Sequence, residues 1–91
     1  MRTSIKTLEY LVNQINELTN SPLTPYSRTG EKFTGNIGNF HISQAYGGVC
    51  VHRMANTSGG VNTPIWQGHI SKREAESQIR SFIRGLEMAR A

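Results

Sequence analysis

The sequence predicts an α+β protein in which two helices pack on one face of a small antiparallel sheet. Three patterns predict this class: an apolar stripe of helical period near the start, an alternating pattern around a glycine turn in the middle, and a capped helical stripe at the end. The predicted order is α–β–β–(β)–α. A chain of 91 residues forms a single domain, residues 1–91, since it is shorter than a common domain of about 100–150 residues.

The first helix is predicted over residues 4–19. Its apolar residues recur three or four positions apart and form one stripe that faces a core: Ile5, Leu8, Leu11, Val12, Ile15 and Leu18. Thr3 or Ser4 caps its start, and Asn20 with the following Ser-Pro ends it.

Residues 20–37 are predicted to be an ordered connection. The segment contains two prolines and two glycines, which break regular structure. It also contains four apolar residues, Leu23, Tyr26, Phe33 and Ile37, and a disordered linker would carry fewer of them.

A hairpin is predicted over residues 38–54, "GNFHISQAYGGVCVHRM". Alternating residues flank the two glycines, and a two-residue turn at Tyr46–Gly47 sets the register. In that register Ile42 lies opposite Val51 and Phe40 opposite Arg53 on one face. On the other face His41 meets His52 and Ser43 meets Cys50.

An edge strand is predicted at about residues 61–67, "VNTPIWQ", because Pro64 has no N–H to donate to a central ladder. The second helix is predicted over residues 71–89. Ser71 and Glu74 match a capping box. The stripe behind it contains Ala75, Ile79, Phe82, Ile83, Leu86 and Ala89.

Composition points to a cytoplasmic protein. One cysteine forms no internal disulfide, which favours a reducing compartment, and no apolar run reaches the roughly 20 residues of a membrane span. The first residues contain no uninterrupted apolar stretch of a secretory signal. The net charge of +4 is spread over the chain, so it permits nucleic-acid binding without requiring it.

No catalytic or metal constellation is complete in the sequence. Zinc sites usually show paired short spacings, whereas here one Cys-x-His and two further histidines are scattered. Cys50 lies in a strand, without the helix N-terminus or acidic partner that activates a thiol, and the chain has no aspartate. We therefore expect no enzyme, no metal and no cofactor.

The sheet face opposite the helices is expected to be open to solvent or to a partner, and to carry His41, Ser43, Cys50, His52 and Trp66. Exposed aromatic residues and arginines are the usual anchors of interfaces. This predicts a partner-binding surface made of His41, Tyr46, His52, Arg53 and Trp66. A protein partner is the leading expectation, and a second copy of the chain is left open.

Nucleic-acid binding is the alternative, through a cationic row on the last helix. The row contains Lys72, Arg73, Arg80 and Arg84. Such a row fits along a phosphate backbone, although glutamates three and four residues away also fit a self-paired, solvated helix face.

Two resemblances follow from these residues. The order of elements, with "SKREA" opening the last helix, resembles the double-stranded RNA-binding domain, where a Ser-Lys-Lys-x-Ala-Lys motif grips phosphates. Ser71, Lys72, Arg73 and Ala75 match, and Glu76 replaces the final lysine. "LTNSPLTPYSR", "GNFHISQAYGGVCVHRM" and "SGGVNTPI" resemble a group of small tailed-phage or prophage proteins. That resemblance implies an accessory protein that binds a host or phage component in a bacterial cytoplasm.

Overall fold

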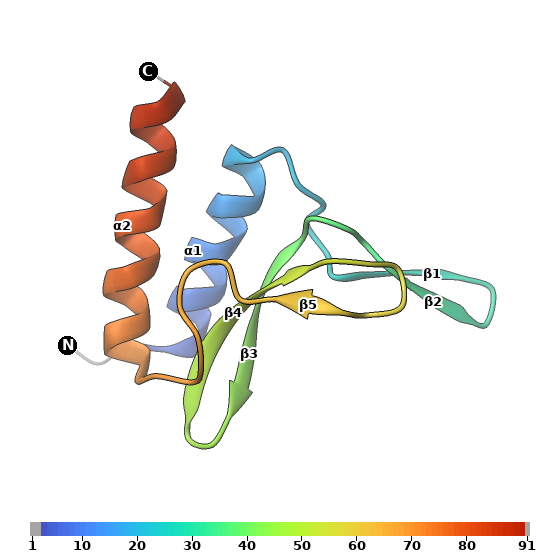
Figure 1. Ribbon diagram of the computed structural model, residues 1–91, viewed down its shortest axis with the longest axis horizontal. Coiled ribbons are helices and arrows are strands. Elements are labelled where there is room, and N and C mark those ends of the chain that lie inside the picture. Colours follow the sequence, from blue (N-terminus) through green and yellow to red (C-terminus); the bar gives the residue numbers. More distant parts are fainter. Residues whose placement is uncertain (1–2, 91) are drawn as a thin grey trace.

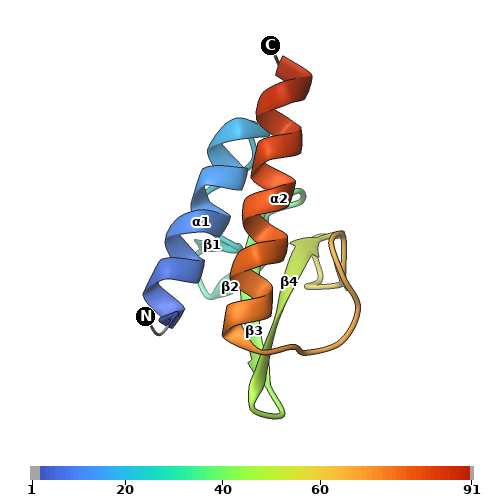
Figure 2. The same ribbon diagram turned by 90° about the vertical axis from the view of Figure 1, so that its left-hand side faces the viewer.

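Two helices lie side by side and cover one face of an antiparallel sheet (Figures 1 and 2). The computed structural model describes residues 3–90, in which α1 (Ile5–Leu18) packs on β3 (Phe40–Ala45) and α2 (Lys72–Arg90) packs on β4 (Gly48–Met54). The predicted α+β class is confirmed.

Helix α1 begins and ends where the sequence predicts. The Ser4 side chain caps it by accepting a hydrogen bond from the Thr7 N–H at 3.2 Å. Asn20 follows the helix with a φ of 55°, the left-handed conformation that ends many helices. The buried face of α1 contains four apolar residues of the predicted stripe, Leu8, Leu11, Val12 and Ile15.

Helix α2 begins with a variant of the predicted capping box. The Ser71 hydroxyl oxygen accepts from the Glu74 N–H at 3.2 Å, as a capping box requires. The Glu74 carboxylate accepts a hydrogen bond from the Ser71 hydroxyl at 3.0 Å rather than from its backbone. Ala75, Ile79 and Ile83 are the buried residues of this helix.

The central hairpin has the predicted register. Tyr46 and Gly47 form the turn with φ values of 53° and 74°, as a type I′ turn requires. Phe40 lies opposite Arg53 and His41 opposite His52, with the pairs between them as predicted. The core between this sheet and the helices contains Leu8, Leu11, Val12, Ile15, Phe40, Val49, Val51, Ala75, Ile79 and Ile83.

The predicted edge strand over residues 61–67 is wrong in length. Only β5 (Val61–Asn62) pairs with β4, and the chain leaves the sheet before Pro64, which cannot donate to the ladder. The chain returns at Ile70, whose N–H and C=O both bond to Val49, at 2.9 and 2.8 Å.

The predicted connection, residues 20–37, contains a second hairpin. Strands β1 (Tyr26–Thr29) and β2 (Lys32–Gly35) pair as a separate two-stranded sheet. Gly30, with a φ of 65°, opens its two-residue turn. The strands are short and all but one of their residues are exposed, so no buried alternation reveals them in the sequence.

Candidate functional site

Three histidines gather on the sheet face opposite the helices. The rings of His41 and His52 are 5.7 Å apart between centroids, and those of His52 and His69 are 6.4 Å apart. His69 comes from the loop between β5 and α2, and its Nε2 lies 3.3 Å from the Ser43 hydroxyl oxygen. We call His41, Ser43, Cys50 and His52, with His69 over them, the histidine face.

The histidine face is only partly open, because its histidines are half-buried and Cys50 is covered. Cys50 is only 1% exposed, and its Sγ lies 3.8 Å from the carbonyl oxygen of Trp66 in the covering loop. At the other end of β4, Met54 is also 1% exposed and lies against the Gly35 backbone. The residues after β5 fold back because Ile70 rejoins the outer edge of β4.

Burial favours the neutral forms of His41, His52 and Cys50. Burial lowers the pKa of His41, and the neighbouring His52 lowers it further. Burial likewise lowers the pKa of His52, with a smaller contribution from His69. Burial raises the pKa of the Cys50 thiol, so at neutral pH this thiol is protonated and unreactive.

The chemistry available to this face is limited. Across residues 3–90, no group of three or more His, Cys, Asp or Glu side chains is arranged to hold a metal ion. Ser43 and His69 form a hydroxyl–imidazole pair, but no hydrogen bond among the described side chains joins a carboxylate to His69. Without that orienting group the pair lacks the third member of a catalytic triad.

The five residues predicted as one partner-binding surface are divided. Tyr46 is 97% exposed at the hairpin tip, with its ring 5.7 Å from that of His69. Arg53 lies on the opposite sheet face, where its guanidinium group is 5.4 Å from the centre of the Phe40 ring. Trp66 is half-buried against the core. Its Nε1 is buried without a hydrogen-bond partner in the part of the chain described here.

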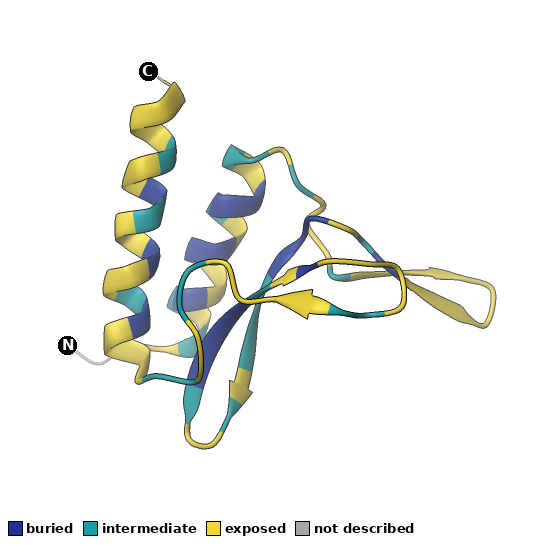
Figure 3. Ribbon diagram, viewed as in Figure 1, coloured by how far each residue is buried: buried dark blue, intermediate teal, exposed yellow. Residues whose placement is uncertain are grey.

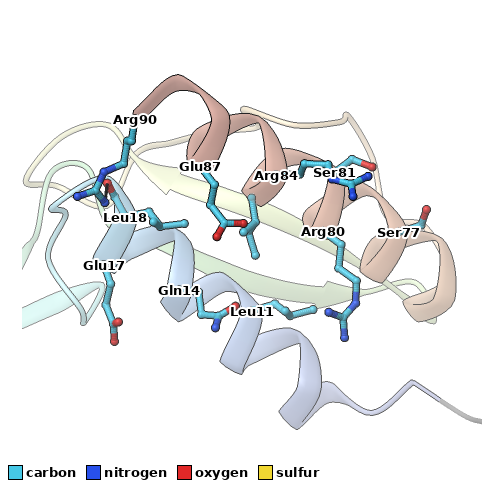
Figure 4. A pocket seen from close by; sticks show the side chains of 11 residues that line it. Leu11, Gln14, Glu17, Leu18, Ser77, Arg80, Ser81, Arg84, Glu87 and Arg90 are labelled. Atoms are coloured by element: carbon cyan, nitrogen blue, oxygen red, sulfur yellow. Dashed lines mark hydrogen bonds between the residues drawn. The ribbon is translucent and has the colours of Figure 1, made fainter.

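The cationic row of α2 is likewise divided. Lys72 and Arg73 are exposed at the start of the helix, whereas Arg80 and Arg84 line a groove of about 880 Å³ between α1 and α2 (Figure 4). Arg80 donates to the Glu76 carboxylate at 2.8 Å.

Glutamates share this interhelical groove with the arginines. Glu17 extends from α1 and Glu87 from α2 (Figure 4). Because carboxylates alternate with the cations, this surface has no continuous positive stripe along which a phosphate backbone could lie.

The most exposed element is one that the sequence did not reveal. Strands β1 and β2 with their turn, residues 26–35, project from the body as an arm (Figure 1), and nearly all of it is exposed (Figure 3). Tyr26, Arg28 and Phe33 share one face of the arm, with the Arg28 guanidinium 5.7 Å from the centre of the Phe33 ring. Phe33 is 66% exposed, which is unusual for a phenylalanine.

The base of the arm is fixed to the body. The Gly35 N–H donates to the Thr57 carbonyl at 2.8 Å, and the Asn36 N–H donates to the Pro25 carbonyl at 2.9 Å. A β-carbon at position 35 would lie 2.6 Å from the Asn56 carbonyl oxygen, so only glycine fits there.

A second groove, of about 550 Å³, runs between α1 and β3 and ends at the base of the arm. We call it the edge groove, because β3 is the outer strand of its sheet on this side. Its lining combines apolar and polar side chains in about equal measure and contains Ile5, Glu9, Tyr10, Val12, Asn13, Asn16, Leu23, Pro25, Asn39, Phe40, His41, Ile42 and Gln44. Tyr10 and Leu23 are 60% and 56% exposed at its rim.

Comparisons with protein-family models, curated proteins and solved structures find no match to this chain. No helix within residues 3–90 is long and apolar enough to cross a membrane.

Proposed function

We propose that this protein is a non-catalytic binding module that contacts another protein through its arm and the adjoining edge groove. The single observation that carries the proposal is where apolar side chains are exposed. Of eight large hydrophobic residues exposed in the described chain, four lie in the arm or beside it, namely Leu23, Tyr26, Phe33 and Ile37. Tyr10, at the rim of the edge groove, adds a fifth.

A protein partner fits this surface for two physical reasons. Exposed apolar side chains concentrated in one part of a small domain favour an interaction site, because leaving them in water costs free energy. An isolated two-stranded ribbon is only marginally stable in water, so docking of one face of the arm on a partner would stabilise it.

The chemistry of the other surfaces supports a binding role over a catalytic one. Cys50 is buried with a raised pKa, and Ser43 and His69 lack an orienting carboxylate. The resemblance to small phage proteins adds a setting to the proposal: the partner is a host or phage protein in the bacterial cytoplasm.

Affinity capture with matched variants tests the proposal. The immobilised wild type, Phe33→Ala and Met88→Ala proteins are incubated with nuclease-treated bacterial lysate, with circular dichroism to verify folding. Met88 is the control because it is 73% exposed, and thus comparable to Phe33, but lies in α2. We expect a protein retained by wild type and Met88→Ala and lost from Phe33→Ala. Equal retention of proteins by all three immobilised variants contradicts the proposal. Retention of nucleic acid alone from a lysate that was not treated with nuclease also contradicts it.

A further inference from the structure

The backbone edge of β3 along the edge groove is only partly protected. The side-chain amide of Asn16 bonds to both backbone groups of Phe40: its Nδ2 donates to the carbonyl at 2.9 Å, and its Oδ1 accepts from the N–H at 2.7 Å. Asn16 thus occupies the position of a neighbouring strand at this one residue. It shows that the backbone of Phe40 points away from β4.

Alternation along an antiparallel strand extends this direction to two further residues. Because the backbone N–H and C=O groups of Phe40 point away from β4, those of Ile42 and Gln44 also point away from it. No hydrogen bond within residues 3–90 occupies these groups. Free strand edges of this kind accept another extended chain, which completes the ladder.

The groove specifies what kind of strand it accepts. Ile5, Leu23 and Ile42 provide an apolar lining. Glu9 is the one carboxylate in that lining, and Lys and Arg are absent from it. The matching occupant is therefore an extended segment that carries a large apolar side chain and positive charge.

The arm has these properties. Phe33 provides an exposed aromatic ring, and Arg28 and Lys32 provide positive charge against the single Glu31 at the tip. The two arm strands form a sheet of their own, and on the outer edge of β2 only Gly35 bonds to the body, through the Thr57 carbonyl. Four residues of strand span about 13 Å, and the free edge from Ile42 to Gln44 spans about 10 Å, so one arm strand is long enough to cover it.

The arm of one molecule is placed to meet the groove of another. It points away from its own body (Figure 1), while Leu23 and Pro25, just before the arm, line the end of the groove. Two molecules related by a two-fold axis would therefore exchange arms reciprocally. Each arm would lie in its partner's groove, which is the closed arrangement expected of a homodimer.

We propose that the protein forms a homodimer in which the arm of each copy adds as a strand to the β3 edge of the other. This inference rests on the proposed function, because it names the partner of the same surface as a second copy of this chain. Burial of Phe33 against the apolar lining and pairing of Glu9 with Arg28 or Lys32 supply the specificity.

Sedimentation equilibrium over a range of protein concentrations tests the dimer. We expect wild type and the control Met88→Ala to have the mass of two chains at tens of micromolar. Phe33→Ala and Glu9→Arg should raise the dissociation constant about tenfold or more, as loss of an interface anchor does. A wild type that remains monomeric up to the highest concentration overturns the proposal, as does a dimer indifferent to both substitutions.

A charge-exchange experiment identifies the contact itself. Glu9→Arg makes the groove positive, and the double variant Arg28→Glu, Lys32→Glu makes the arm negative. Each variant alone should be monomeric, and an equimolar mixture should form a heterodimer because both arm–groove contacts are then complementary. A mixture that stays monomeric, while wild type dimerises, overturns the arm–groove assignment.

The two proposals fail in distinguishable ways. If wild type is monomeric but captures a different protein in a Phe33-dependent manner, the binding function stands and the homodimer is refuted. If wild type dimerises in a Phe33-dependent manner and captures no other protein, the homodimer stands and a different host or phage partner is refuted. If wild type neither self-associates nor captures a protein, both are refuted.

Discussion

Asn16 should be one of the largest single contributors to stability among the polar residues of this protein. Its side chain is 1% exposed and satisfies both backbone groups of Phe40, at 2.9 and 2.7 Å. No other partner for these groups is found within the described chain. Substitution by alanine would remove both bonds at once.

The loss of stability in Asn16→Ala can be estimated from the two Phe40 backbone groups that lose their hydrogen-bond partner. Leaving one buried donor or acceptor without a partner costs about 1–3 kcal/mol, so two cost about 2–6 kcal/mol. Because Asn16 lines the edge groove, water can enter and replace part of the loss. We therefore expect Asn16→Ala to lower the free energy of unfolding by about 2–3 kcal/mol. This is a large share of the roughly 5–15 kcal/mol typical of a domain.

Urea denaturation followed by circular dichroism measures this change. With an m-value of about 1 kcal/mol/M, the midpoint should fall by about 2 M. Asn13→Ala is the matched control, because Asn13 is exposed on the same helix and should change stability by less than about 0.5 kcal/mol.

Asn16→Asp makes the test specific to the hydrogen-bond geometry. An aspartate can accept from the Phe40 N–H, but its charge faces the Phe40 carbonyl, so burial should raise its pKa. The variant should then become more stable relative to wild type as the pH falls and the carboxyl group becomes a donor. An Asn16→Ala variant within 0.5 kcal/mol of wild type, or an Asn16→Asp variant with the opposite pH trend, would refute the reasoning.

Three further predictions concern glycines, histidines and the thiol. Gly48→Ala should destabilise the fold by about 1–3 kcal/mol, since its β-carbon would lie 2.8 Å from the Ile70 carbonyl oxygen. Gly85 lies in open space on α2, so Gly85→Ala should stabilise the fold by up to about 1 kcal/mol. Thermal melts measure both changes, and melting temperatures that shift in the same direction would contradict this. The pKa values of His41 and His52 are lowered in the folded state, so the unfolded chain binds more protons and stability should fall as the pH drops below about 6.5 through the folded values. Urea midpoints from pH 7.5 to 5 should show a weaker decline in the double variant His41→Gln, His52→Gln, and an unchanged decline would exclude these groups. Cys50, 1% exposed with a raised pKa, should react with a thiol reagent at least roughly tenfold more slowly in the folded than in the urea-unfolded protein, and equal rates would show that the covering loop opens freely.

Long periodic segments were predictable because the fold follows their pattern directly. The stripe of α1, the Ser71 cap of α2 and the register of the β3–β4 hairpin all depend on side chains close in sequence. The register in particular follows from alternation and the two-residue turn, since a shift by one residue would expose Val49 and Val51.

The candidate site was less predictable, because it depends on contacts between distant segments. The sequence indicated that His41, His52, Ser43 and Cys50 share a sheet face, and they do. It gave no sign that His69 and the Trp66 backbone cover that face, since the return of the chain at Ile70 is a single bridge after an irregular loop.

The arm was also difficult to predict from the sequence. Its strands have four residues each and bury almost nothing, so they lack the alternation by which the β3–β4 hairpin is recognised. A signal was present in the Thr29-Gly30-Glu31-Lys32 turn between two short β-prone segments, but it is weak without a core face.

The sequence by itself determined the class of this protein, its two helices, and the pairing of its central hairpin, because these follow from local periodicity and capping. Only the tertiary structure decided which surfaces are available. It partly covered the predicted histidine face, placed carboxylates between the arginines of α2, and exposed Phe33 on a projecting arm. Exposure depends on which distant segments meet, and no local pattern in the chain encodes that.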